Sequence, residues 1–118
     1  MNNKIVLCLH NEVYVIHCES VLYMQADDHY THIVCMSGAR FMVPFGLSEL
    51  EKRLDTVMTD DKFLIRVGRK YIINMRHVFH VNTVKQVAVL ADSNGNNYSV
   101  SLPKPILRNI IERLSGSE

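Results

Sequence analysis

The feature that most constrains the fold is a series of short apolar runs, rich in β-branched and aromatic residues, that are separated by polar turns. Runs of this length and composition are typical of β-strands. They lie at residues 5–9, 13–17, 21–25, 29–36, 40–43, 71–74, 78–81, 84–90 and 98–100. Ser37-Gly38 provides one turn, and residues 92–96 (DSNGN) give the clearest hairpin signal. The sequence therefore predicts a mainly β fold of small antiparallel sheets.

Two segments carry a helical period instead. Residues 48–54 (SELEKRL) place Leu50 and Leu54 on one face with Leu47, and Ser48 and Glu51 have the spacing of a capping box. Residues 105–114 (PILRNIIERL) form the second helix, and prolines near its start favour helix entry. Its apolar stripe consists of Ile106, Ile110, Ile111 and Leu114. We expect a mid-domain helix and a C-terminal helix, both packed on the core.

Length and composition indicate one globular domain. The chain has 118 residues, of which 47% are hydrophobic and 21% charged, and no long linker divides it. Residues 1–118 are thus predicted to form a single domain. A signal peptide and a membrane span are not expected, because the N-terminal apolar run is short and interrupted. With three cysteines, an odd number, the thiols are expected to be reduced in a cytoplasmic location.

Charge is distributed unevenly along the chain. Residues 1–61 carry four basic and nine acidic side chains, a formal charge of −5, whereas residues 62–118 carry nine basic and three acidic ones, a charge of +6. Between Asp61 and Asp92 there is no acidic residue. The basic residues there are Lys62, Arg66, Arg69, Lys70, Arg76 and Lys85. This asymmetry favours a polyanionic partner such as nucleic acid; the alternative is that both halves fold into one surface of mixed charge.

The sequence gives little support for a metal site or a catalytic site. His29, His32 and Cys35 have an HxxHxxC spacing, but in a strand His32 points away from the other two. The sequence lacks a glycine-rich phosphate loop, a nucleophile elbow and an HExxH motif. We therefore expect no metal, no cofactor and no enzymatic activity.

Residues 63–74 (FLIRVGRKYIIN) concentrate basic side chains in a strand-like run that ends on an amide. Arginine and lysine provide phosphate contacts, and they can also contact base edges. Asn74 could offer a donor and an acceptor to a base, or it could simply form a turn at the strand end. The two expected helices are too far apart in the sequence for a helix-turn-helix. DNA would therefore be contacted by loops or strand ends.

Four segments in order resemble the LytTR-type DNA-binding domain of bacterial response regulators and other transcription factors. They are ESVLYMQADDHYTHIVC, SELEKRL, FLIRVGRKYIIN and YSVSLPKPILRNIIERL. The second is similar to the family's mid-domain helix, and the third to its hallmark segment, which runs from phenylalanine through arginine to asparagine. The resemblance covers about residues 13–114.

The resemblance implies an output domain of a transcription regulator, as in two-component systems, that inserts loops into successive major grooves and bends the duplex. Two copies would bind a repeated site, and a receiver domain is expected if the chain is an excised fragment. The implied contacts are His29, Tyr30, Thr31 and His32, then Asn74 with Arg76, and then residues 101–104 with Lys104. Arg69 matches the basic residue of the hallmark segment, and Arg66 and Lys70 accompany it.

The chain also departs from the family pattern. Gly68 stands where members usually have a histidine, and Leu102-Pro103 stands where members often have an arginine. These departures favour an alternative function, a protein-interaction or sensory β module that has lost DNA binding. The sequence predicts DNA binding as the function, with this module as the alternative.

Overall fold

The computed structural model describes residues 3–116 and is mainly β, as the sequence predicts. Its centre is a five-stranded antiparallel sheet with the strand order β5-β4-β3-β7-β6. The strands are β3 (Val21–Asp27), β4 (Tyr30–Cys35), β5 (Arg40–Val43), β6 (Leu64–Val67) and β7 (Tyr71–Asn74). Strands β5 and β6 form the two edges of this sheet. Strand β3 pairs with β7, and this pairing holds the β3–β4 and β6–β7 hairpins side by side.

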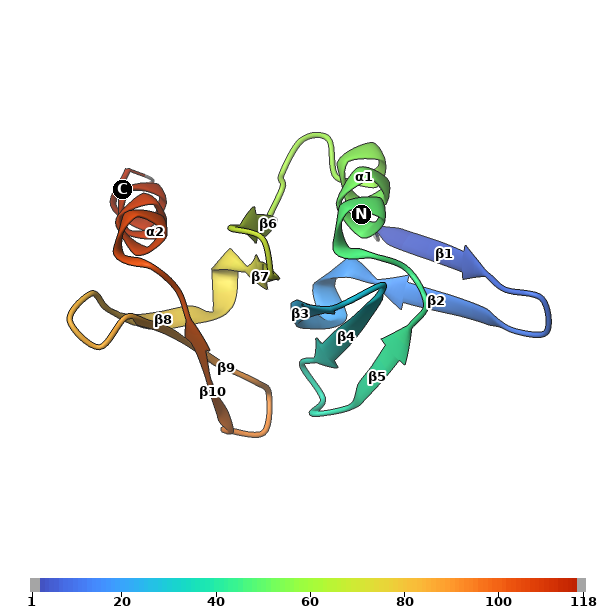
Figure 1. The fold of residues 1–118 in the computed structure, drawn as a ribbon, viewed down its shortest axis with the longest axis horizontal. Helices are drawn as coiled ribbons and strands as arrows, with labels where there is room; N and C mark the ends of the chain where they lie inside the picture. The colour runs from blue at the N-terminus through green and yellow to red at the C-terminus, as the bar shows by residue number, and fades with distance from the viewer. Residues whose placement is uncertain (1–2, 117–118) are drawn as a thin grey trace.

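Two smaller sheets and two α-helices flank the central sheet within the described residues (Figure 1). One sheet pairs β1 (Lys4–Cys8) with β2 (Val13–His17), and the other has the order β10-β9-β8. Its strands are β8 (Val78–Asn82), β9 (Val87–Ala91) and β10 (Asn97–Ser101). The helices are α1 (Leu47–Val57) and α2 (Lys104–Ser115), and short 3-10 turns occupy Cys18–Ser20 and Met75–His77. None of the helices in residues 3–116 is long and apolar enough to cross a membrane.

The central sheet separates two hydrophobic cores. Successive residues of a strand point to opposite faces, so Ile33 and Ile72 join the core under α1 and the β1–β2 hairpin, whereas Val34 and Ile73 join the core with α2 and the C-terminal sheet. All four side chains are fully buried. Burial on both faces explains why these strands read as continuous apolar runs rather than as alternating ones.

The segment at residues 63–74 is a hairpin, so its interpretation as one strand-like run is wrong. Leu64 pairs with Asn74 at one end of this hairpin and Val67 with Tyr71 at the other. The chain reverses at Gly68, whose φ of 77° lies in the left-handed region that glycine adopts readily. Gly68 therefore allows a sharp turn at this point of the run.

Both helices form where the sequence predicts them, with different details. The N-cap of α1 is Gly46, which makes no side-chain cap, and Ser48 lies inside the helix, so the capping box is not formed. In α2 the buried side chains are Leu107 and Ile110. Ile111 and Leu114, expected in the apolar stripe, remain 37% and 36% exposed. The stripe that packs on the small C-terminal sheet is therefore narrower than the sequence predicts.

The Asp92 carboxylate organises the β9–β10 turn. It accepts hydrogen bonds from the backbone N–H groups of Asn94 and Asn96, both at 2.9 Å, and from the Tyr98 hydroxyl at 2.9 Å. The ordered turn then reaches the β4–β5 turn, where the Asn94 side chain donates to the Ser37 carbonyl at 2.7 Å. A single carboxylate therefore helps to fix two sheets relative to one another.

This network predicts a pH-dependent contribution to stability. Burial acts to raise the pKa of Asp92, but the hydrogen bonds from Asn96, Tyr98 and Asn94 together lower that pKa below its ordinary value. A lowered folded-state pKa gives stability that is present above the unfolded-state pKa of about 3.9 and is lost as the pH falls through the folded-state value. Asp92→Asn should lower the urea midpoint at pH 7 and flatten the loss of stability below about pH 5.

The check is urea denaturation followed by circular dichroism between acid and neutral pH. Asp60→Asn, at an exposed carboxylate, is the matched control and should keep the pH profile of the unmodified protein. An unchanged profile for Asp92→Asn would show that the network contributes nothing to the folded state.

Candidate nucleic-acid interface

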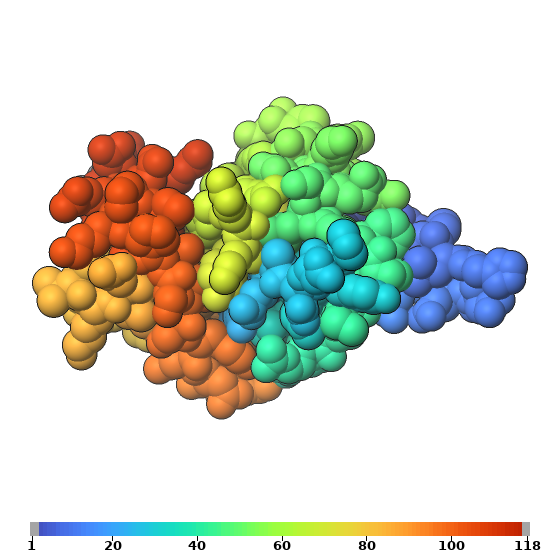
Figure 2. All heavy atoms as spheres, in the orientation of Figure 1, coloured from blue at the N-terminus to red at the C-terminus, as the bar shows by residue number. Residues whose placement is uncertain are grey.

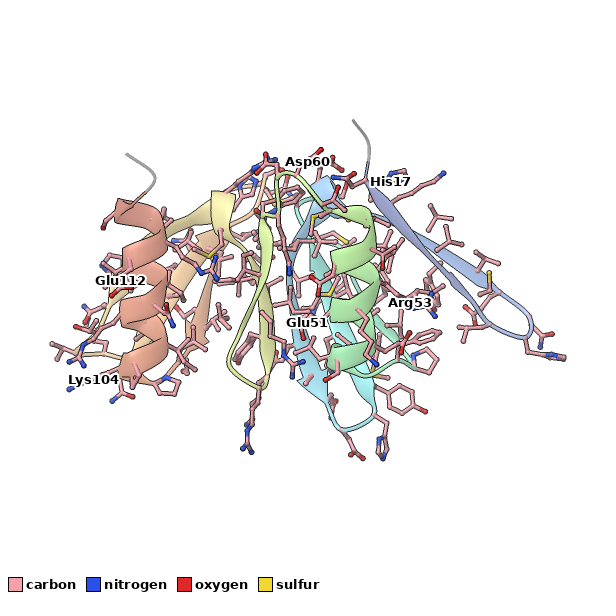
Figure 3. The ribbon with its side chains drawn as sticks, turned by 90° about the horizontal axis from the view of Figure 1, so that it is seen from above. His17, Glu51, Arg53, Asp60, Lys104 and Glu112 are labelled. Carbon is pink, nitrogen blue, oxygen red and sulfur yellow. The ribbon has the colours of Figure 1, made fainter. Side chains whose placement is uncertain are left out.

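Three turns that are distant in the sequence meet along one edge of the molecule. The β3–β4 and β6–β7 turns are joined by a backbone hydrogen bond from Ala26 N–H to the Lys70 carbonyl at 2.8 Å. The β6–β7 turn also contacts the first turn of α2, since a Cβ built on Gly68 would lie 2.8 Å from Ile106 Cδ1. In Figure 3 both hairpin turns and Lys104 lie at the lower edge, and Figure 2 shows this edge facing the viewer. We call these three segments the loop edge.

The β6–β7 turn presents two exposed basic side chains, Arg69 and Lys70. Arg66 is turned inward instead, and its guanidinium donates to the carbonyls of Gly68 at 3.2 Å and Arg69 at 2.9 Å. It also bonds to Ser48 and Glu51 on α1. Of the three basic residues predicted in this segment, Arg69 and Lys70 therefore point to solvent, and Arg66 supports the turn.

The β3–β4 turn provides His29 and Tyr30, both exposed. Thr31 is fully buried, and its hydroxyl donates to the Phe45 carbonyl at 2.8 Å, so it holds the loop from inside. His32 Nε2 lies 2.8 Å from an oxygen of the Asp27 carboxylate. Of the four residues predicted here, His29 and Tyr30 are therefore exposed, with His29 Nε2 3.7 Å from an Asp28 oxygen, while His32 is partly exposed beside Asp27 and only Thr31 is buried.

The entry to α2 provides Lys104, which is exposed in the first turn of the helix. The positive end of the helix dipole lies at the same place and favours an anion. Leu102 is only 5% exposed and belongs to the core with α2, so its side chain serves packing. Residues 101–103 and the β6–β7 turn line a common surface hollow of about 450 Å³.

Lys85 is a basic residue that the sequence analysis did not include in the site. It is exposed in the β8–β9 turn, and that turn is drawn to the loop edge by a hydrogen bond from Leu102 N–H to the Gln86 carbonyl at 3.1 Å. Lys85 lies in the stretch of the sequence without acidic residues, but no local motif predicts that it lies near the loop edge. The hydrogen bond between Leu102 and Gln86 depends on the pairing of β10 with β9, which brings two distant segments together.

Asn74 and Arg76 lie at the other end of the β6–β7 hairpin, away from the loop edge. Asn74 is 1% exposed; its side-chain amide donates to the Val21 carbonyl at 2.9 Å, and its oxygen accepts from Arg76 N–H at 3.1 Å. Arg76 bonds to Asp61 and lies over the Phe63 ring at 4.2 Å. The sequence leaves two roles open for Asn74, contact with a base and formation of a turn at the strand end. The hydrogen bonds to Val21 and Arg76 are those of a turn former.

Comparisons with known proteins agree with this architecture. The sequence model described as the LytTr DNA-binding domain matches residues 11–111. The CO-responsive transcriptional regulator RcoM of Rhodospirillum rubrum is 45% identical over 58 residues, which are 49% of this chain and 22% of that regulator. The chain therefore matches less than a quarter of that relative's length.

A solved structure is also similar, the LytTr DNA-binding domain of a putative methyl-accepting/DNA response regulator from Bacillus cereus. The TM-score is 0.62, the match covers 97% of both chains, and the sequences are 19% identical. This likeness concerns the fold, and it confirms the predicted mainly β architecture. The predicted resemblance to the family is confirmed as well.

The position of Gly68 leads to a prediction on stability. A non-glycine residue in the left-handed region costs roughly 1–2 kcal/mol, and at Gly68 the added Cβ would also press on Ile106. Gly95 has a similar φ of 86°, but among the described residues nothing lies within 4 Å of its added Cβ. Gly68→Ala should therefore lower the free energy of unfolding more than Gly95→Ala does, as measured by urea denaturation. Equal losses would mean that the contact with α2 is unimportant.

Proposed function

The chain belongs to the family of LytTr DNA-binding domains, and from this premise we propose that it binds double-stranded DNA sequence-specifically as the output domain of a bacterial transcription regulator. The family is one of DNA-binding domains and not of enzymes. In this proposal residues 1–118 act as one domain, and the loop edge is the surface that meets the duplex.

The observation that carries the proposal is the gathering of exposed basic side chains on protruding turns. Arg69 and Lys70 come from the β6–β7 turn, Lys104 from the start of α2, and Lys85 from the β8–β9 turn beside it. Contacts with phosphates supply much of the affinity of such surfaces. At the opposite edge, marked by Asp60 in Figure 3, Arg76 is paired with Asp61 instead.

Base reading is assigned to the two hairpin turns. Arg69 can form a bidentate contact with guanine in the major groove, and its turn is already held by Arg66. His29 and Tyr30 extend from the neighbouring turn, where Asp28 can accept from the amino group of cytosine. Asn74 contributes indirectly, because its buried amide fixes the far end of the hairpin.

Two copies are proposed to occupy a repeated site, with the turns of each copy in successive major grooves. A receiver domain or another sensory segment would control the chain if it is part of a longer protein. The cytoplasmic location expected from the sequence stays a prediction.

Salt dependence provides the first test. Log affinity for duplex DNA should fall linearly with log salt, with a slope of about 0.9 for each phosphate contact. Lys70→Ala and Lys104→Ala should each weaken binding and reduce that slope by about 1, as measured by mobility shift at several salt concentrations. Arg76→Ala is the control, because it removes the same charge at the opposite edge, and it should leave the slope unchanged. If the unmodified protein does not bind DNA even at low salt, the proposed function is wrong.

A protein-interaction module remains the second candidate, and a specific observation favours it. Val6, Val13 and Val15 are 40%, 56% and 51% exposed on the β1–β2 hairpin, an apolar surface of the kind that partner proteins cover. A binding selection from random duplexes separates the two functions. We expect an enriched direct or inverted repeat, and Arg69→Ala should lose preference at one position by about 1–3 kcal/mol. A selection without enrichment would favour the interaction module.

A further inference from the structure

Arg66 makes an unusual set of contacts at the base of the β6–β7 turn. On one side its Nη1 group donates to Ser48 Oγ at 3.0 Å and to Glu51 Oε1 at 3.1 Å. On the other side Nε and Nη2 donate to the carbonyls of Gly68 and Arg69, at 3.2 and 2.9 Å. The guanidinium therefore connects helix α1 to the turn that carries Arg69.

The geometry of this bridge needs an arginine. Ser48 and Glu51 are three residues apart, so they lie on one face of α1 and can share a donor. A guanidinium offers five N–H donors in a rigid plane, whereas a lysine ammonium is a point charge that cannot span both sides. The Arg66 side chain is 22% exposed and that of Glu51 36%, so the ion pair is partly shielded from solvent.

The two carbonyls that Arg66 holds belong to a turn that is flexible by composition. Gly68 gives up more conformational freedom on ordering than any other residue would, and the neighbouring Arg69 and Lys70 are exposed. A turn that is ordered before binding avoids the entropy cost of ordering it on the ligand. The contacts of Arg66 contribute to that order in the free protein, beside the backbone hydrogen bond from Ala26 to Lys70.

We propose that Arg66, anchored by Glu51 and Ser48, is a positioning residue that holds the β6–β7 turn in the conformation in which Arg69 and Lys70 meet DNA. This role rests on the proposed function. In this arrangement Arg66 is not expected to neutralise a phosphate, because its charge is paired with Glu51 and four of its five N–H donors meet protein acceptors. Its loss should lower affinity without changing the number of phosphate contacts.

Substitution of Glu51 gives the sharpest test, because simple electrostatics and the proposed anchoring of Arg66 predict opposite changes in DNA affinity. Removing an acidic side chain near a DNA-binding surface strengthens binding by simple electrostatics. If Glu51 anchors Arg66, Glu51→Gln should instead weaken binding, by roughly three- to tenfold, since a neutral amide oxygen holds the guanidinium less strongly than a carboxylate does and the loosened turn must be ordered on DNA. Glu49→Gln is the matched control: it makes the same charge change on the same helix, but Glu49 pairs with Arg53 and not with Arg66.

The experiment measures fluorescence anisotropy of a labelled duplex over several salt concentrations with Glu51→Gln, Glu49→Gln, Arg66→Gln and Lys70→Ala. We expect Glu51→Gln and Arg66→Gln to lower affinity at an unchanged salt slope, Lys70→Ala to lower both affinity and slope, and Glu49→Gln to leave affinity equal or higher. Amide hydrogen exchange of the free proteins should quicken at residues 68–70 in Glu51→Gln and not in Glu49→Gln, which separates a freed turn from general unfolding.

Affinity of Glu51→Gln equal to or above that of the unmodified protein would overturn the positioning role and leave the proposed function standing. A salt slope reduced by about 1 in Arg66→Gln, which removes the charge, or unchanged exchange at residues 68–70 in Glu51→Gln, would overturn the role as well. Absence of DNA binding by the unmodified protein at low salt would overturn the proposed function itself, and this role with it.

Discussion

The rest of the structure depends on the burial of the central sheet on both faces. Ile33 and Ile72 on one face and Val34 and Ile73 on the other are fully buried. Because the centre of the sheet is covered on both faces, it cannot itself present a polar binding surface. Polar chemistry is confined to strand ends and turns, which is where binding residues commonly lie on a rigid scaffold. The two covering layers then determine which turns meet.

The pairing of β3 with β7 brings the β3–β4 and β6–β7 turns to the same edge, and packing of α2 against the other face adds a third segment. The number of basic residues between Asp61 and Asp92 is therefore larger than the number of basic side chains that one surface presents to a ligand. Arg66 supports the turn, while Arg76 and Lys62 pair with Asp61 and Asp55. Arg69 and Lys70 keep their side chains exposed at the loop edge, and Lys104 and Lys85 join them from other parts of the chain.

Much of the fold could be predicted from the sequence, because short apolar runs and two helical periods are local signals. β2, β5 and β7 have the predicted bounds, and the other predicted strands lie within a few residues of theirs. Less of the candidate DNA-binding site could be predicted from the sequence. The reversal at Gly68 depends on one backbone conformation, and Ser48 and Glu51 have capping-box spacing although they bond to Arg66 from a distant strand. The burial of Thr31 and Asn74 is likewise set by tertiary contacts, with Phe45 and Val21.

The central claim is that DNA meets the loop edge and not the edge that carries Asp61 and Arg76. Amide chemical-shift mapping of the isotopically labelled protein, titrated with a short duplex at low salt, tests it most directly. The account predicts the largest shifts at residues 28–30, 68–70, 85–86 and 101–104, with small shifts at residues 59–62 and 74–77. Shifts concentrated at the second set, or on the β1–β2 hairpin, would contradict it.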